Sequence, residues 1–392
     1  MVKFTHIIRG KKDNGQEVHT LNSKNSAYRL LTLIALSGEC SMEIVSHMQM
    51  GQSYGEKLIT RLKDEKYIKT HYKDRLRGYR LTSKGKKMLI QKNPDRFLFY
   101  LSGNTDTNRP RSDFTRRLRL QQSSVVYAMM QNAEISIFRD KKPALFQQER
   151  CEKNQKLPLP VFYHAREIKE LGNEAIKINN SRMMGVLLAE ECAYVVFYTG
   201  EYLMKWERQT ELRVKSMLQY HISRGLLSRQ EVISGYLPDT PVKALFIGKD
   251  MDTSVKILQS RGGTMKSCFC LDASFDFFHY IPENSAGETI LKLLCRPKLR
   301  SMLKNLLMSD LMPPTEQLGL EHDAIKDGEP VLFAYEYDLL KISRFATALA
   351  LHGITGNLVC FDFQKEALEK YFCDCVTIDT IDLGKFEGRF LT

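Results

Sequence analysis

The sequence predicts a mixed fold of the α+β and α/β classes, in which a small N-terminal unit precedes a larger α/β region with a mixed sheet. Three observations predict it. Short helical patterns and a basic hairpin occupy the first hundred residues, β-rich runs alternate with helical runs after about residue 136, and the excess positive charge is confined to the first part of the chain. At 392 residues the chain is too long for one ordinary core, so two or three domains are expected.

The N-terminal helices are predicted from apolar periodicity and from capping residues. Residues 26–37 repeat apolar side chains at helical spacing, and Gly38 is a suitable C-cap. Ser41 is expected to cap a second, short helix. A third helix is expected from Ser53 to about Glu65, with an apolar inner face and a polar, basic outer face.

A hairpin is predicted directly after the third helix. Residues 67–72 alternate like a strand, residues 73–78 read as a basic turn, and residues 79–81 return as a second strand. Thr82 then begins a capping sequence for a further helix. Three helices in this order, the third with a basic outer face and followed by a basic hairpin, are typical of a winged helix-turn-helix.

This region resembles the winged-helix repressor families of bacteria and archaea. In those families the third helix ends in a leucine, runs through an aromatic or leucine residue and an isoleucine into a two-stranded wing, and closes on a YxLTxKG sequence. The resemblance covers about residues 25–92 and implies a DNA-binding fold, while it leaves the biological role open. It is carried by Leu62, Tyr67, Ile68, Tyr79, Arg80, Leu81, Thr82, Ser83, Lys84 and Gly85.

The charge distribution supports a polyanionic partner for the N-terminal part. Residues 1–150 hold 29 lysines and arginines against 14 acidic residues, whereas residues 151–392 hold 29 against 32. Such asymmetry favours nucleic acid over an anionic membrane, because no Lys/Trp-rich amphipathic helix or lipidation signal is present. No apolar run is long enough to cross a bilayer and no signal peptide is recognisable, so a cytoplasmic location without a membrane partner is expected.

Double-stranded DNA is therefore the expected partner. The third helix would enter the major groove, the wing would lie on the backbone or in the minor groove, and cations that follow would contact phosphates. The alternative is a winged helix used only for protein contacts, with these charges forming a solvated face. The predicted DNA-binding residues are Gln52, Ser53, Tyr54, Lys57, Arg61, Arg75, Arg77, Lys84, Lys86, Lys87, Arg116 and Arg117.

The chain is predicted to divide into a winged-helix domain at 1–92, a basic connector at 93–135 and a partner-docking α/β region at 136–392 with room for two subdomains. The connector should hold a loop or hinge between Ser102 and Asp113, followed by a helix. This helix is either part of the DNA footprint or a dimer element, so a homodimer is a candidate assembly. Its arginines, which favour DNA contact, are Arg109, Arg111, Arg116, Arg117 and Arg119.

The α/β region is predicted from strands and helices that alternate along the chain, which favours right-handed crossovers and a mixed or parallel sheet. Residues 331–376 resemble one β-α-β-α unit. The candidate strands are 182–188, 194–198, 243–248, 277–281, 331–337, 358–363 and 376–379. The candidate helices are 207–222, 251–260, 286–307, 339–351 and 365–372.

Little in this region indicates catalysis. The glycines do not form a phosphate-binding loop, no histidine pair has metal-ligand spacing, and the nine cysteines read as reduced thiols. A metal-dependent nuclease would need an acid on one strand and an acid-x-lysine pattern on the next. We therefore expect no enzyme activity, metal or cofactor, and keep a diverged nuclease as an alternative. The aspartates near strands that lack this pattern are Asp272, Asp276, Asp362, Asp379 and Asp382.

The order of parts, a basic winged helix, an arginine-rich connector and a long α/β region, resembles the replication-relaxation proteins of plasmids and conjugative elements. The resemblance implies an accessory DNA-binding factor that helps a relaxase or replication initiator to act at an origin, within a relaxosome or replication complex. The main alternative is a transcriptional regulator whose C-terminal domain senses a ligand or mediates dimerisation.

Overall fold

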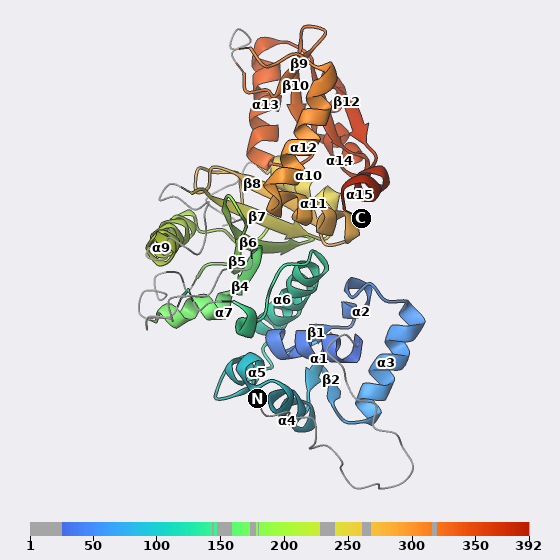
Figure 1. Ribbon diagram of the computed structural model, residues 1–392, viewed down its shortest axis with the longest axis vertical. Helices are drawn as coiled ribbons and strands as arrows, with labels where there is room; N and C mark the ends of the chain where they lie inside the picture. The colour runs from blue at the N-terminus through green and yellow to red at the C-terminus, as the bar shows by residue number, and fades with distance from the viewer. Residues whose placement is uncertain are drawn as a thin grey trace, which may run out of the picture.

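The computed structural model describes residues 26–142, 145–146, 159–172, 178, 180–227, 240–260, 268–315 and 320–391. Within them the chain is a mixed α and β protein with three sheets, two of which combine parallel and antiparallel strands. The N-terminal sheet and its helices form one end of the molecule, the five-stranded sheet lies in the middle, and the four-stranded sheet forms the other end (Figure 1).

The N-terminal unit contains three helices followed by an antiparallel hairpin and a fourth helix. The hairpin belongs to a three-stranded sheet with the order β1-β3-β2. The first helix has the predicted bounds, and both hairpin strands are present. The elements are α1 (Ser26–Ser37), β1 (Cys40–Ser41), α2 (Ile44–His47), α3 (Gln52–Asp64), β2 (Ile68–Lys73), β3 (Leu76–Leu81) and α4 (Ser83–Lys92).

The capping predictions in this unit have different outcomes. The prediction that Ser41 caps the second helix is wrong, because Ser41 belongs to β1 and pairs with Gly78 of β3. The helix α2 begins only after Glu43. The cap at Thr82 is confirmed, since its hydroxyl accepts a 3.2 Å hydrogen bond from the amide of Gly85 at the start of α4.

The central sheet has the strand order β4-β5-β6-β7-β8. Its first three strands are antiparallel neighbours, whereas β6, β7 and β8 run parallel. The strands are β4 (Val161–His164), β5 (Met183–Leu188), β6 (Ala193–Gly200), β7 (Val242–Gly248) and β8 (Phe278–Pro282). The helices of this part are α7 (Ala165–Ile168), α9 (Arg208–Leu227), α10 (Met251–Leu258), α11 (Ser285–Cys295) and α12 (Pro297–Leu307).

The single helix predicted over residues 286–307 is two helices. Arg296 takes an extended conformation between them, and Pro297 occupies the first turn of α12. A proline lacks the amide proton that a continuous helix needs, and it disfavours helical geometry in the residue before it. The same proline suits the start of a helix, where its amide would have no partner.

The four-stranded sheet has the order β12-β11-β10-β9, with three parallel strands and β9 antiparallel at the edge. It contains the predicted β-α-β-α unit. Its elements are β9 (Ala324–Lys326), β10 (Glu329–Phe333), α13 (Leu339–His352), β11 (Gly356–Phe361), α14 (Lys365–Phe372), β12 (Val376–Ile381) and α15 (Leu383–Phe390). Short 3-10 turns occur at Arg139–Lys141, Lys169–Leu171, Met308–Asp310, Asp362–Gln364 and Cys373–Cys375.

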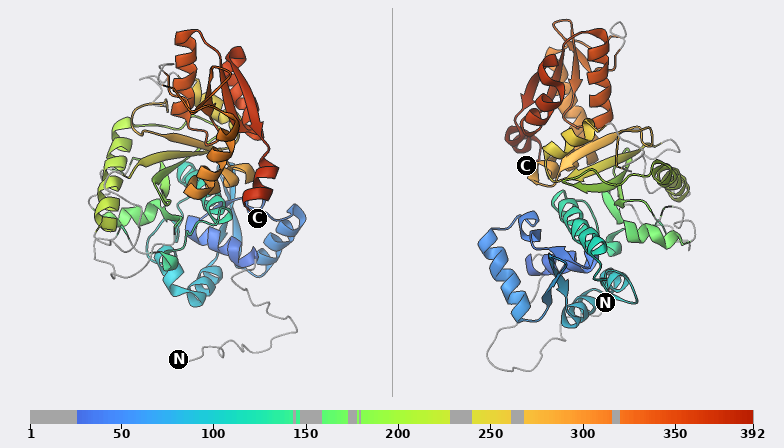
Figure 2. Two further views of the ribbon diagram at one scale, coloured as in Figure 1. Left: turned by 45° about the horizontal axis from the view of Figure 1, so that its top comes forward. Right: turned by 180° about the vertical axis from the view of Figure 1, so that it is seen from behind.

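The connector confirms the predicted order of loop and helix: α5 (Pro94–Leu101), a loop at 102–113, and α6 (Phe114–Asn132). Both views in Figure 2 and the view in Figure 1 place α6 between the N-terminal unit and the central sheet. It contacts α1, α2 and β1 on one side and β6 and α11 on the other. One cluster of buried apolar side chains accordingly includes Leu31 of α1, Met129 of α6 and Tyr194 of β6.

Candidate nucleic-acid interface

The helix α3 is held by its apolar face, which leaves its opposite face to solvent. Leu58, Ile59 and Leu62 are buried against the rest of the N-terminal unit. Gly55 permits a close approach to α2, because a Cβ atom there would lie 2.1 Å from Cγ1 of Val45. This packing fixes the orientation of the exposed face.

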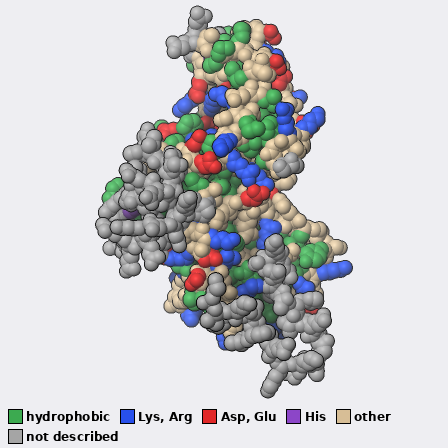
Figure 3. Space-filling view, in the orientation of Figure 1, with side chains coloured by type: hydrophobic (Ala, Val, Ile, Leu, Met, Phe, Trp, Pro, Cys, Tyr) green, Lys and Arg blue, Asp and Glu red, His purple; other side chains and the backbone are tan. Residues whose placement is uncertain are grey.

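The five residues predicted to read DNA from α3 are all exposed: Gln52, Ser53, Tyr54, Lys57 and Arg61. Tyr54 is 51% exposed. Arg61 has only a loose, solvent-exposed contact of 4.0 Å with Glu65, and such pairs contribute little to stability. In the space-filling view, basic side chains protrude at the outer edge of the lower half of the molecule, where α3 lies (Figure 3).

The hairpin places two more predicted residues in solvent. Asp74 and Arg75 form its turn with φ angles of 50° and 60°, the left-handed pair that a two-residue hairpin turn requires. Arg75 is exposed at this tip. Arg77 is also exposed, and its guanidinium lies 5.5 Å from the ring centre of Tyr72, its partner across the two strands.

Arg117 does not lie on this surface, which corrects the prediction that it contacts DNA. Its side chain is fully buried and forms a 2.7 Å ion pair with Glu39. It also donates hydrogen bonds to the carbonyls of His71, Lys73 and Leu76, so it holds the hairpin from the inside. Because its guanidinium is buried and paired within the fold, it cannot contact a phosphate.

The remaining predicted cations differ in how free they are. Arg116 and Lys87 are exposed. Lys84 is exposed, but its ammonium donates to the carbonyl of Glu65 at 2.9 Å. Lys86 is half-buried and donates to Asn108, and its burial lowers its pKa. Lys86 therefore ties α4 to the connector loop and is poorly placed to bind a phosphate.

The structure adds exposed cations that the sequence prediction omitted. Lys69 and Lys73 lie on the solvent side of β2, and Lys66 precedes that strand. The signal was present in the sequence, because a strand with Ile68 buried turns every second side chain outward. Together with Arg75 and Arg77, these lysines make the hairpin the more basic of the two elements.

The connector arginines are divided between surface and interior. Arg109 and Arg111 are exposed, whereas Arg119 is half-buried and donates to the carbonyl of Met183 in β5 at 3.0 Å. The prediction that the whole arginine cluster faces DNA is therefore wrong. From Gln121 to Met130 most side chains of α6 are buried within this chain, so this part of the helix is not free to act as a dimer element, and the homodimer stays a prediction.

No catalytic constellation appears among the described residues. Three of the aspartates considered for a nuclease each have a different partner. Asp272 accepts from the indole of Trp206, Asp276 pairs with Lys215, and Asp379 pairs with Lys326. Within the described ranges no group of three His, Cys, Asp or Glu side chains could hold a metal ion. The eight cysteines described there form no disulfide with one another.

In the part of the chain that the structure covers, no helix combines the length and apolar character needed to cross a membrane. Comparisons of the chain with models of protein families, with curated proteins and with solved structures found no match.

Proposed function

We propose that this protein binds double-stranded DNA, with its N-terminal unit acting as a winged helix-turn-helix. The observation that carries the proposal is the arrangement of α3 and the β2–β3 hairpin. Both elements turn most of their aliphatic side chains inward, and both leave polar and cationic side chains in solvent. Lys57 and Arg75 have no carboxylate partner among the described residues.

The chemistry of these side chains fits a duplex. An α-helix fits the major groove, where the amide of Gln52 and the guanidinium of Arg61 can meet base edges. The cations of the hairpin supply phosphate contacts that give affinity without sequence information. The tip residue Arg75 is suited to the backbone or to a narrow minor groove.

The proposal is tested by fluorescence anisotropy with a labelled duplex over a series of salt concentrations. Replacing Lys57, Arg75 and Arg77 by alanine together removes three cations from the surface. We expect the slope of log affinity against log salt to fall by about 3, since each phosphate contact contributes about 0.9. Unchanged affinity and slope in this triple variant would overturn the proposal.

A matched control removes three exposed cations of the C-terminal region, outside α3 and the hairpin. Arg344, Lys365 and Lys385 have side chains that are 62%, 46% and 87% exposed, and within the described ranges each pairs only with a surface carboxylate. The corresponding triple alanine variant should bind the duplex with the affinity and salt slope of the unmodified chain. An equal loss in both triple variants would show that net charge alone produces the binding.

We further propose that the protein is an accessory factor in the DNA processing of a plasmid or conjugative element, with the α/β region docking a relaxase or replication initiator. What supports this role is that the large α/β region is joined by polar contacts to the unit that we propose binds DNA. Lys249 after β7 lies 3.4 Å from Glu43 before α2, and Glu288 of α11 accepts from Gln49 in the α2–α3 turn at 2.7 Å.

The role is tested by nicking of a supercoiled origin plasmid by the relaxase of the same element. Addition of the protein should raise the nicking rate, and the triple alanine variant of α3 and the hairpin should not. A footprint confined to the protein's own promoter would instead favour a transcriptional regulator. Metal-dependent cutting by the protein alone would favour the diverged nuclease.

A further inference from the structure

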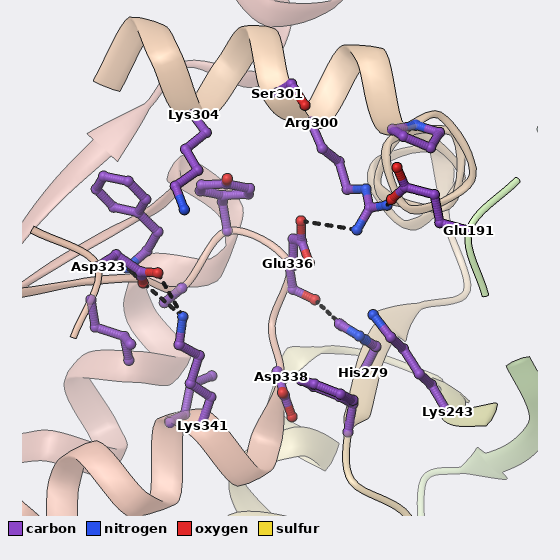
Figure 4. Close-up of a pocket in the computed structure, with 17 residues that line it drawn as sticks. Glu191, Lys243, His279, Arg300, Ser301, Lys304, Asp323, Glu336, Asp338 and Lys341 are labelled. Atoms are coloured by element: carbon purple, nitrogen blue, oxygen red, sulfur yellow. Dashed lines mark hydrogen bonds and ion pairs between the residues drawn. The ribbon is translucent and has the colours of Figure 1, made fainter. Parts of the chain in front are cut away.

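A cavity of about 310 Å³ lies in the C-terminal region, away from α3 and the hairpin. Its walls are the starts of β7 and β8, α12, the end of β10 with the segment that follows it, and the first turn of α13 (Figure 4). In α/β sheets, ligands bind beyond the carboxyl ends of parallel strands, and the segment after β10 occupies such a position. The volume falls at the lower end of the range for small-molecule sites.

Each carboxylate that lines the cavity already has a partner within the protein, whereas some of the cationic side chains do not. Glu191 pairs with Arg300 at 2.6 Å, and Asp323 pairs with Lys341 at 2.8 Å. Glu336 approaches Arg300 at 4.0 Å. The fourth carboxylate, Asp338, accepts from the backbone amides at the start of β8 and of α13.

Two lysines that line the cavity, Lys243 and Lys304, have no carboxylate within ion-pair distance among the described residues. In Figure 4, Lys304 extends from α12 and Lys341 from α13 toward the same space. Lys243 lies over the ring of Phe277, with its ammonium 4.5 Å from the ring centre. Lys243 and Lys304 can therefore neutralise an anion without breaking an existing ion pair.

Two buried polar atoms at this cavity lack a hydrogen-bond partner, within the part of the chain described: Nε2 of His279 and Nε of Arg300. The His279 side chain is 2% exposed, and its Nδ1 lies 3.1 Å from the carbonyl of Glu336. A carbonyl only accepts, so Nδ1 carries the proton and Nε2 of the neutral ring presents a lone pair. Burial, together with the nearby Lys243 charge, lowers the pKa of His279 to about 4, which keeps the ring neutral.

Unpaired buried polar atoms are costly, and a ligand that meets both of these would remove the cost. We propose that the cavity binds a small phosphorylated molecule that also carries a hydroxyl group, such as a sugar phosphate or a nucleoside monophosphate. The ammonium groups of Lys243 and Lys304 and Nε of Arg300 are the donors that the cavity offers to the phosphate oxygens. The hydroxyl donates to Nε2 of His279.

The remaining walls suit the carbon skeleton of such a ligand. Phe277, Phe333 and Tyr335 line the cavity, and they provide apolar contacts for a sugar or base. The site is independent of the proposed DNA surface, because none of its lining residues belongs to the N-terminal unit.

The proposal is tested by calorimetric titration of the full chain with adenosine monophosphate, ribose 5-phosphate, adenosine and inorganic phosphate. At least one of the two phosphate esters should bind, at least about tenfold more tightly than either inorganic phosphate or adenosine. Removing both lysines, as Lys243→Ala with Lys304→Ala, should weaken ester binding by about tenfold or more.

Two further variants separate the site from general charge. Ser301→Trp places a large ring at an exposed lining position and should block binding without touching a charge. Lys298→Ala removes an exposed cation from the same helix outside the cavity and should leave binding unchanged. Absence of ester binding at millimolar concentration, equal binding of adenosine, or equal losses in the Lys298 and the double-lysine variants would each overturn the proposal. Loss of ester binding on addition of duplex DNA, with weaker duplex binding by the double-lysine variant, would assign the cavity to DNA and overturn it too.

Discussion

Arg117 of α6 and Glu39, two residues after α1, form an ion pair from which solvent is wholly excluded, with 2.7 Å between Nη2 and Oε1. Burial acts to raise the pKa of Glu39, but hydrogen bonds from Arg117, Gln121 and Arg80 outweigh it and lower the pKa. Because Arg117 also donates to three hairpin carbonyls, the position of the hairpin depends on α6. The helix that touches the central sheet thus also supports the proposed wing.

Arg117→Ala should destabilise the protein strongly. It removes one of the two arginines that compensate Glu39 and leaves three hairpin carbonyls without their donor. Breaking a buried pair by removing one partner costs about 3 to 5 kcal/mol, and we expect a loss in the free energy of unfolding near the lower figure, because Arg80 remains 2.6 Å from Glu39. Urea denaturation measures it. Arg116→Ala, at the exposed neighbouring position, is the control, and equal stability of the two variants would contradict this account.

Gly55→Ala should destabilise α3 although alanine favours helices. The added Cβ would lie 2.1 Å from Val45 Cγ1, so α2 and α3 must separate, and overpacking of this kind costs about 1 to 3 kcal/mol. The gain in helix propensity offsets about 1 kcal/mol of this. Adding Val45→Ala should recover part of the loss from Gly55→Ala, which a double-mutant cycle by thermal denaturation detects. Additive effects of the two changes would show that the contact is not limiting.

Much of the fold could be predicted from local pattern, but the use of individual charges could not. Helical periodicity located α1 and α6, alternation of side chains located β2, and β-rich runs between helices located most strands of the later sheets. By contrast, Arg116 and Arg117 are adjacent in one basic run, and only one is buried. What decides between them is Glu39, which lies 78 positions earlier in the chain, so the distinction is a tertiary contact without a local signal.

The candidate cavity could not be predicted from the sequence either. Its residues come from β7, β8, α12, β10 and α13, and they meet only because two separate sheets adjoin there. The break between α11 and α12, in contrast, could have been predicted from Pro297, because a proline ends or starts a helix. Periodicity on both sides of that residue concealed it, because α11 and α12 both continue the apolar pattern.

Glu288→Ala should loosen the turn between α2 and α3. The Glu288 carboxylate accepts from Gln49 at 2.7 Å and from the amide of Asn132, so it joins α11 to that turn and to the end of α6. Its loss leaves the half-buried amide of Asn132 without this acceptor, which costs about 1 to 3 kcal/mol, whereas the exposed amide of Gln49 can bond to water instead. Hydrogen exchange should become faster at residues 44–51 while α14 keeps its protection. Faster exchange throughout the chain, or unchanged exchange at residues 44–51, would contradict a local role.

Glu211 should make stability depend on pH. Burial raises the pKa of this carboxyl to about 7, from a usual 4.5, and its oxygens accept from Ser181 Oγ at 2.9 Å and from the amide of Arg182. The folded chain then binds the proton more tightly than the unfolded chain. The resulting stability is complete below pH 4.5 and is lost as pH rises through 7.

The size of this effect follows from linkage, and a neutral variant isolates it. The loss is on the order of 3 kcal/mol, at about 1.36 kcal/mol per unit. Glu211→Gln stays uncharged, so its free energy of unfolding, relative to the unmodified chain, should rise by that order between pH 4.5 and 7.5. Urea denaturation across this range measures the difference. A constant difference would show that Glu211 titrates normally.

Arg75→Gly should separate folding from DNA binding. Arg75 holds a φ of 60° in the hairpin turn, a conformation that costs a non-glycine residue energy and that glycine adopts freely. We therefore expect a melting temperature equal to or above that of the unmodified chain. Duplex affinity should nevertheless fall, with a decrease of about 1 in the salt slope, because one phosphate contact is gone.

Asp74→Gly, at φ 50° in the same turn, is the matched control, since it relieves similar strain and removes a negative charge. It should bind the duplex at least as well as the unmodified chain. Equal duplex affinity in the two glycine variants would mean that the tip of the hairpin does not contact DNA.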